Sequence, residues 1–404
     1  TLRSPSALEP DRREAVVAGT TKLAWQTSCS LKARRTSRSF DAPSMTHSER
    51  VSRWAQVSAA LALQSDQQLN RVVDEAEQLA TGIGGTTVAF EIEGFKVFAK
   101  RLRLTDLEQR PENRLSTRNL FGLPTFCQRN VGSVGFGVWR ELAANTMTTG
   151  WVLSKALDSF PLMYHWRVLE GVAASRAAPL PDELADVDGM VSYWEGAEAM
   201  GERLRALAKA TASVMIFLEH VPWNLSTWLD RQLAAGPEAM EAACTMVERG
   251  LTVDVPLMNS LGLHHGDAHL GNILTDGHRL FFADLGLAMS ERFALSADEL
   301  SYLKHNASLD RAYVLAKWVN WLVKTWARTA NSPHDRMDLI RSAAQGHPLH
   351  QLIPDLPSCA AAIVRRHAPI ATVINDFYVK LHGERRSARY PRDDVEALLR
   401  TATA

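Results

Sequence analysis

Hydrophobic and polar positions alternate most clearly in the first quarter of the chain. Val88, Phe90 and Ile92 occupy every second position, which is typical of a strand with one buried face. A turn at Gly94 leads into a second strand over residues 96–102. These two segments predict an antiparallel β-hairpin.

Other segments show a helical spacing of apolar residues or a short apolar run. The run 212–218 is too short for an isolated helix and predicts a buried strand. Polar residues with scattered glycine and proline predict a loop over 105–135. The predicted helices cover 48–80 (as two helices), 136–158, 191–211 and a segment that begins at Pro237.

A second hairpin is predicted near residue 276. Residues 272–275 and 278–283 are two strand-like runs, separated by Asp276-Gly277. This dipeptide fits a type I′ turn, whose central residues need positive φ. Asn272 begins the first run and Asp284 follows the second, so the hairpin should bring the two side chains together.

The polar groups at the open end of this hairpin suit one kind of chemistry. An amide oxygen from Asn272 and a carboxylate from Asp284 are ligands that Mg²⁺ accepts together with substrate phosphates. A further carboxylate, Asp267, precedes the hairpin and is available to take a proton from a hydroxyl. A metal clamp beside a positioned base predicts phosphoryl transfer.

These motifs resemble those of a known family. Residues 265–267 (His-Gly-Asp), Asn272 and residues 284–286 (Asp-Leu-Gly) resemble the catalytic loop and metal-binding triplet of the protein-kinase-like superfamily. The superfamily includes Ser/Thr protein kinases and the aminoglycoside and choline phosphotransferases. The resemblance implies an α+β, two-lobed fold, with a small antiparallel-sheet N-lobe, a mainly helical C-lobe, and ATP and Mg²⁺ between them.

The resemblance also implies residue roles. Asp267 would be the catalytic base, and His265 would brace its loop. Asn272 and Asp284 would hold the metal. On the nucleotide side, the resemblance implies that Lys100, with its helix partner Glu141, binds the phosphates. The phosphates would be covered by a glycine-rich loop that contains Gly82, Gly84, Gly85 and Thr86. The backbone of the linker from Glu219 to Val221 would bind adenine.

Three of these assignments have competitors in the sequence. Lys96 lies on the same face of its predicted strand as Lys100, and an exposed strand lysine is usually only solvated. Glu170 and Glu195 compete with Glu141. The glycine cluster could equally be an ordinary turn, because such clusters are weak evidence by themselves.

The same resemblance suggests a division of the chain. Residues 1–44 show no sustained period and are expected to be a disordered or non-native extension. Residues 45–220 would form the N-lobe with helical additions, and residues 221–404 the helical C-lobe with the catalytic loop and metal-binding hairpin.

Composition narrows the possible partners. The 404 residues contain 45 Lys+Arg and 45 Asp+Glu, so no overall basic field favours nucleic acid or an anionic membrane. No apolar run approaches the roughly 20 residues that a membrane span needs. The four cysteines lie far apart, which argues against a disulfide framework. We therefore expect a cytoplasmic protein whose partners are ATP and a hydroxyl acceptor.

The identity of that acceptor stays open. His269, two residues after the predicted base, and the lack of an Ala-Pro-Glu triplet favour a small-molecule acceptor, whereas Asp284-Leu285-Gly286 favours a protein Ser/Thr acceptor. A nucleotide-binding scaffold without transfer activity is a further alternative. A metallohydrolase built on His264, His265, Asp267 and His269 fits less well, because the adjacent His264 and His265 of an extended chain point to opposite sides.

Overall fold

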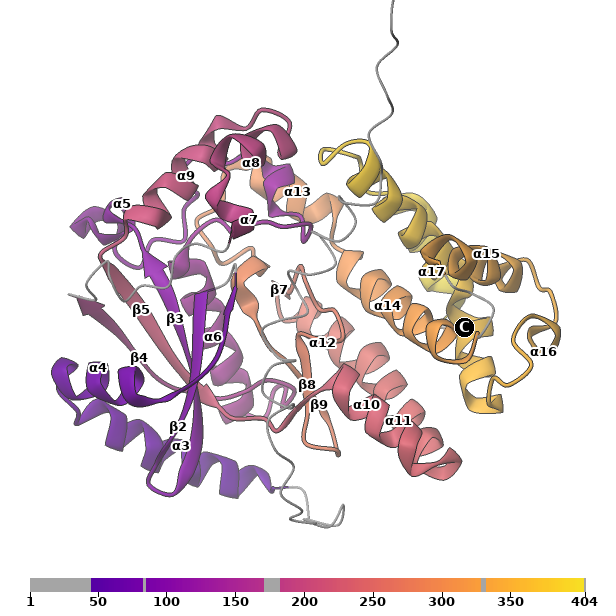
Figure 1. Ribbon diagram of the computed structural model, residues 1–404, viewed down its shortest axis with the longest axis horizontal. Helices are drawn as coiled ribbons and strands as arrows, with labels where there is room; N and C mark the ends of the chain where they lie inside the picture. The colour runs from indigo at the N-terminus through magenta and orange to yellow at the C-terminus, as the bar shows by residue number, and fades with distance from the viewer. Residues whose placement is uncertain (1–44, 83–84, 171–181, 328–331, 403–404) are drawn as a thin grey trace, which may run out of the picture.

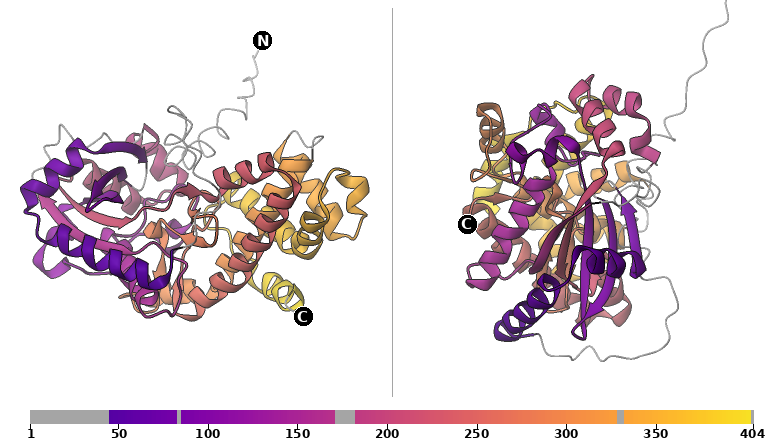
Figure 2. Two further views of the ribbon diagram at one scale, coloured as in Figure 1. Left: turned by 90° about the horizontal axis from the view of Figure 1, so that it is seen from below. Right: turned by 90° about the vertical axis from the view of Figure 1, so that its left-hand side faces the viewer.

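The computed structural model describes residues 45–82, 85–170, 182–327 and 332–402. The predicted extension over residues 1–44 and the predicted loop residue Gly84 lie outside this part of the chain. Within the described residues, the molecule has a five-stranded sheet at one end and a group of long helices at the other, as Figure 2 shows in its left-hand view.

The sheet contains both strands of the predicted N-terminal hairpin. Its order is β1-β2-β3-β5-β4, and every neighbouring pair is antiparallel. The hairpin of β2 and β3 and the predicted strand at 212–218 are confirmed. The five strands are β1 (Glu77–Gly82), β2 (Gly85–Ile92), β3 (Phe95–Leu104), β4 (Met163–Glu170) and β5 (Ala212–Glu219).

Two of the helical predictions were wrong in detail. The first helices are α3 (His47–Ala62) and α4 (Asp66–Glu75), after which residues 77–82 form β1 instead of continuing the helix to residue 80. Pairing with β2 outweighs the local helical spacing there. The predicted helix over 191–211 is two helices, α8 (Val187–Tyr193) and α9 (Glu198–Lys209), because Glu195 and Gly196 adopt positive φ between them.

Side chains along β3 alternate between the two faces of the sheet, and each face packs against different helices. Val97 and Ala99 belong to the large core that includes α3 and α4, whereas Phe98 and Leu102 pack in a separate cluster with α6 (Val138–Leu153). Lys100 shares the parity of Phe98 and Leu102. Its side chain therefore emerges on the α6 side of the sheet.

Helices make up most of the chain after β5, with α14 packed against α17 (Figure 1). The helix predicted at Pro237 is confirmed as α11. The longer helices are α10 (Leu225–Ala235), α11 (Pro237–Arg249), α12 (Val255–Ser260), α13 (Ala297–His305), α14 (Leu309–Trp326), α15 (Pro333–Ala344), α17 (Ser358–Gly383) and α18 (Arg392–Ala402). Short helices are α5 (Asp106–Gln109), η2 (Pro111–Asn113), η3 (Thr125–Gln128), α7 (Asp182–Ala185), η4 (Gly250–Asp254), η5 (Leu285–Leu287) and α16 (Leu349–Leu352).

Small strands connect the sheet end to the helical end. The predicted second hairpin is confirmed as β8 (Ile273–Thr275) and β9 (Leu280–Phe282), with β6 (Trp223–Asn224) beside β8. A further pair joins β7 (Leu263–His264) to β10 (Met289–Ser290). The predicted α+β, two-lobed fold is confirmed, while the lobe boundary at residue 220 stays a prediction. In the described part of the chain, no helix is both long and apolar enough to traverse a bilayer.

Candidate functional site

A cavity of about 860 Å³ lies between the sheet and the β8–β9 hairpin. Its walls come from β2, β3 and α6, from the linker after β5, and from the loop over residues 130–135. Of the predicted site residues, those that line it are Gly85, Thr86, Lys100, Glu141, Glu219, Val221, Asp267, Asn272 and Asp284. The structure thus brings residues from distant parts of the sequence to one cavity.

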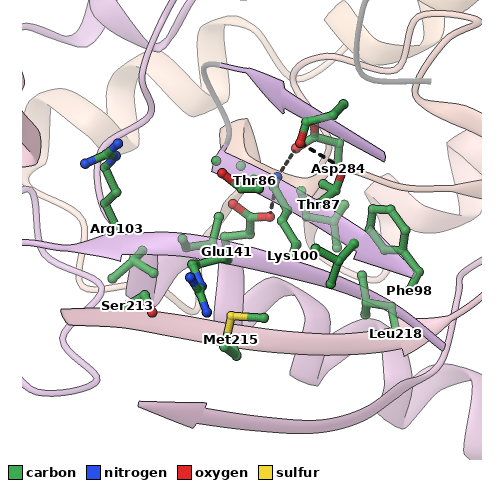
Figure 3. A pocket seen from close by; sticks show the side chains of 18 of the residues that line it. Thr86, Thr87, Phe98, Lys100, Arg103, Glu141, Ser213, Met215, Leu218 and Asp284 are labelled. Carbon is green, nitrogen blue, oxygen red and sulfur yellow. Dashed lines mark hydrogen bonds and ion pairs between the residues drawn. The ribbon is translucent and has the colours of Figure 1, made fainter. Parts of the chain in front are cut away.

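Lys100 lies at the centre of this cavity, between two carboxylates (Figure 3). Its Nζ donates to Glu141 Oε1 and to Asp284 Oδ1, both at 2.7 Å. Lys100 and Glu141 are each only 6% exposed, whereas the side chain of Asp284 keeps 39% of its surface open toward the cavity. Lys96, the competitor of Lys100, is exposed.

The three charges shift one another's pKa. Burial alone would lower the pKa of Lys100, but Asp284 and Glu141 outweigh it and raise that pKa above its ordinary value. Burial raises the pKa of Glu141 despite the nearby ammonium. Burial also acts to raise the pKa of Asp284, yet Lys100 lowers it overall. Lys100 and Asp284 therefore both stay charged near neutral pH.

The backbone at Asp284 is unusual. This residue has φ 60° and ψ 73°, which is the left-handed region that non-glycine residues seldom occupy. Such a conformation costs on the order of 1–3 kcal/mol and persists where the surroundings enforce it, often at functional sites. Here it turns the chain from β9 into η5, and the carboxylate reaches Lys100.

The hairpin before Asp284 has a different turn from the one predicted. Thr275 pairs with Leu280, so four residues connect the strands, and only Gly277 of the Asp276-Gly277 pair has positive φ. The type I′ prediction was wrong because Asp276 Oδ1 accepts hydrogen bonds from the backbone N–H groups of His278 and Arg279, which fixes a longer turn. The strand pairing still sets Asn272 opposite Ala283, whose N–H donates to Asn272 O at 2.9 Å.

Asp267 lies at the edge of the cavity and accepts hydrogen bonds from two amides. Asn130 Nδ2 donates to its Oδ1 at 3.0 Å, and Asn272 Nδ2 donates to its Oδ2 at 3.2 Å. Burial raises the pKa of Asp267 to about 7, and the hydrogen bond from Asn130 offsets part of that rise. A carboxylate that is held in place and has a pKa near neutrality is suited to accept a proton from a hydroxyl.

The loop that carries Asp267 is braced from beneath by two buried groups. His265 is fully buried, and its Nε2 donates to Ala283 O at 3.0 Å while its Nδ1 accepts from Asp267 N at 3.3 Å. Asp310 accepts from the backbone N–H groups of His265 and Gly266 at 2.7 and 2.9 Å. Gly266 has φ +77°, and a Cβ there would lie 2.6 Å from Leu287 O, so the loop requires glycine.

The donor set fits a hard cation that also binds substrate phosphates. The side chain of Asn272 forms hydrogen bonds only through Nδ2 among the described residues, so its amide oxygen Oδ1 is available. Asp284 contributes a carboxylate that lines the same cavity. Within the described residues, no group of three or more His, Cys, Asp or Glu side chains could hold a metal. The predicted metal ligands, Asn272 and Asp284, are thus two protein oxygens, and the rest of the coordination would come from water and substrate phosphates.

Of the glycine cluster, Gly82 ends β1 and Gly85 begins β2. Gly82 pairs with Gly85, so a first strand does precede the loop. Gly85 has φ +112°, and a Cβ there would lie 2.2 Å from Arg101 O. Gly85 and Thr86 line the cavity. Their position above Lys100 is compatible with the predicted contact to phosphates, which stays a prediction.

The linker after β5 is fixed from behind by a residue that sequence reasoning missed. Arg50 of α3 donates to both carboxylate oxygens of Glu219, through Nε at 3.1 Å and Nη2 at 2.5 Å. Glu219 Oε2 also accepts from Leu162 N at 3.2 Å. The side chain of Glu219 is therefore engaged with α3, and the linker backbone, His220 and Val221 remain to contact a base in the cavity.

Asn130 and Asp310 were also missed. Both contact the loop that carries Asp267. Asn130 does so from the loop before α6, and Asp310 from the first turn of α14. Asp310 left a faint signal, since it is an acid at the start of a helix that is otherwise mostly apolar. Asn130 lies in a polar loop and left none. The competitor Glu170 is exposed, and Glu195 binds Ser387, away from Lys100.

Comparisons with known proteins add little to this geometry. No protein-family model matches the chain, and no curated protein matches it. Among solved structures, the chain is similar to one described as WaaP in complex with acyl carrier protein, with 14% sequence identity and a TM-score of 0.32. That match covers 78% of this chain and 92% of the other. A likeness this remote carries no argument about function, which rests on the residues of the cavity.

Proposed function

We propose that this protein is a phosphotransferase that moves the γ-phosphoryl group of ATP to a hydroxyl acceptor in a Mg²⁺-dependent reaction. The observation that carries the proposal is the buried Lys100, which joins Glu141 to Asp284 at 2.7 Å each in the cavity that Asp267 also lines. A phosphate-binding cation, a metal-binding carboxylate and a candidate base then share one site, as phosphoryl transfer requires.

Each residue has a task that follows from its surroundings. Lys100 would bind phosphate oxygens, and Glu141 would hold the ammonium in place, because its carboxylate is buried and adjacent. Asp267 would orient the acceptor hydroxyl and accept its proton at a carboxylate oxygen. His265 and Asp310 would position Asp267 by fixing the loop backbone.

The nucleotide would be held by backbone groups at its two ends. The N–H groups near Gly85 and Thr86 would cover the phosphates, and the linker from Glu219 to Val221 would bind adenine. When bound, Mg²⁺ would neutralise charge on the phosphates, with Asn272 and Asp284 as the residues that hold it.

The metal-dependent binding of ATP is the first test. ATP should raise the thermal midpoint of the parent protein more in the presence of Mg²⁺ than in its absence. The Asp284→Ala variant should lose the Mg²⁺-dependent part of this shift, whereas Glu291→Ala, which alters an exposed acid after β10, should behave as the parent does. Equal Mg²⁺-dependent shifts in the parent and in Asp284→Ala would reject the site.

A second test separates an enzyme from a scaffold that only binds nucleotide. Turnover of γ-labelled ATP, to water or to an added acceptor, should fall about 10²-fold or more in Asp267→Asn, as for loss of a general base. Binding of ATP should be retained in the same variant. Turnover equal to that of the parent would favour the alternative of a nucleotide-binding scaffold.

A further inference from the structure

Beyond Asp267, helices α14 and α17 place basic and aromatic side chains close together. The ammonium of Lys317, on α14, lies 4.9 Å from the ring centre of Tyr313 and 5.3 Å from that of Tyr378, on α17. In the described part of the chain, Lys317 has no hydrogen bond and no ion pair, and its ammonium lies against these two rings. Two aromatic faces stabilise its positive charge, and no carboxylate forms a direct ion pair with it in the described residues.

This lysine is connected to the predicted base through two short contacts. Tyr378 Oη donates to Asn130 Oδ1 at 2.5 Å, and Asn130 Nδ2 donates to Asp267 Oδ1 at 3.0 Å. Asp267 and Asn130 both line the cavity. The charge of Lys317 also acts on Asp267, because each favours the charged form of the other. Lys317 is therefore next to the place where an acceptor hydroxyl would meet its base.

The row of rings and cations continues along α17 and past its end. The rings of Tyr378 and His382 are 6.2 Å apart, and the guanidinium of Arg386 lies 3.9 Å from the ring centre of Tyr193. Partial desolvation, Arg386 and Lys317 together lower the pKa of His382 to about 4. We call Lys317, Tyr378, His382, Arg386 and Tyr193 the acceptor-side cluster.

Arg386 is short of partners even though two of its nitrogens are shielded from solvent. Its Nε and Nη1 make no hydrogen bond in the structure described here. Glu195 is close enough to favour the guanidinium charge, but its carboxylate oxygens accept from Ser387 N and Oγ at 3.0 and 2.7 Å. Shielded cationic donors without a partner are costly. Nη2 of Arg386 is not among the shielded atoms, and it is the donor that an anion could reach.

The sign of this charge discriminates between acceptors. Aminoglycosides and choline are cations at neutral pH, and Lys317 and Arg386 would repel them. A carboxylate or a phosphate group would instead gain charge-assisted hydrogen bonds from the same two side chains. The rings of Tyr378 and Tyr193 could pack against the carbon skeleton of the same molecule.

We propose that Lys317 and Arg386 bind an anionic group on the phosphate acceptor, and that this acceptor is a hydroxylated small molecule with a carboxylate or a phosphate group. The inference rests on the proposed function, because Asp267 defines the side from which the acceptor enters. It goes further by assigning a chemical class to the acceptor and by naming two specificity-determining residues.

The test uses inorganic phosphate as the probe of this anion site. The full-length protein is first saturated with Mg²⁺ and a non-hydrolysable ATP analogue, which occupies the γ-phosphate position, and phosphate is then titrated by calorimetry. Phosphate should bind the parent, bind Lys317→Met and Arg386→Met at least tenfold more weakly, and bind Lys317→Arg nearly as well as the parent. Lys324→Met, an exposed position on the same helix, should leave its affinity unchanged.

Two outcomes would overturn the inference. Either phosphate fails to bind the parent, or it binds Lys317→Met and Arg386→Met as tightly as the parent. If Lys317→Met does not fold, the affinity of Arg386→Met for phosphate still tests the proposal. Failure of the nucleotide analogue to bind would instead count against the proposed function, and the phosphate titration without nucleotide would still test the cluster.

A competition experiment distinguishes the two anionic groups. Glycerol 3-phosphate, glycerate, glycerol and 2-amino-1,3-propanediol share a three-carbon hydroxylated skeleton and differ in charge. Displacement of bound phosphate by glycerol 3-phosphate alone assigns a phosphate group, and displacement by glycerate as well extends the assignment to carboxylates. Displacement by neither anion, or by the amine alone, contradicts the proposed acceptor class.

Discussion

The buried pair between Arg50 and Glu219 offers a direct test of how the linker is held. Arg50 is 1% exposed and Glu219 is 6% exposed. The two side chains form a two-pronged contact at 3.1 and 2.5 Å, and Arg50 Nη2 also donates to Phe160 O at 2.8 Å. Removal of one member of such a pair leaves an uncompensated buried charge, which costs about 3–5 kcal/mol.

The expected results follow from this arrangement. Arg50→Met should lower the free energy of unfolding by about 3–5 kcal/mol, because the buried Glu219 carboxylate loses its cation. The backbone N–H of Leu162 would still donate to this carboxylate but cannot neutralise its charge. The double variant Arg50→Met/Glu219→Met should recover about 2 kcal/mol or more of that loss, since it leaves neither charge buried. Affinity for ATP should fall in Arg50→Met, because Glu219 begins the linker that lines the cavity.

Urea unfolding followed by tryptophan fluorescence and by circular dichroism measures these free energies, provided that the two transitions coincide. Arg205→Met, at an exposed position of α9, serves as the control and should change stability by less than about 0.5 kcal/mol. The reasoning is refuted if Arg50→Met costs less than about 1 kcal/mol. It is equally refuted if the effects of the two single variants simply add in the double variant.

Three further changes probe the cavity and its loop. Glu141→Gln should weaken Mg²⁺-ATP binding by about tenfold in calorimetry, because Lys100 loses a carboxylate partner, and an unchanged affinity would count against the pair. Asp310→Asn should lower stability by about 2 kcal/mol, because the two loop N–H groups bind different carboxylate oxygens and an amide keeps only one of these oxygens. ATP turnover should fall in this variant while ADP still binds. Gly266→Ala should lower the thermal midpoint more than Gly346→Ala, because both have positive φ but only the former is crowded; equal losses would contradict this.

The parts of the site that were predicted from the sequence are those determined by short-range pattern. The β8–β9 hairpin follows from two apolar runs with a turn between them, so Asn272 and Asp284 could be placed together without knowledge of the fold. Lys100 follows the apolar residues 97–99, which indicate a protected setting, and the structure buries it while Lys96 on the same strand is exposed. In each case a few neighbouring residues contain the information.

The contacts that hold and surround these residues are non-local. Asn130 reaches Asp267 across 137 positions, and Arg50 reaches Glu219 across 169. No local period reports such a pairing, because it depends on how the elements pack. The turn type at Asp276 was also mispredicted, since its side chain competes with the backbone for hydrogen bonds and lengthens the loop. No local pattern marks Lys317, because one of its two aromatic contacts comes from α17.

Several features around Asp267 are difficult to explain by folding stability alone. Asp284 occupies a strained backbone region, and Lys317 and Arg386 are half-buried cations without ion-pair partners in the described chain. Apolar side chains at these positions would avoid the cost of burying charge. A scaffold that only bound nucleotide would need Lys100 but would have no use for cations on the acceptor side. Their placement on that side, next to a base held by Asn130 and Asn272, is what a transferase for an anionic acceptor requires.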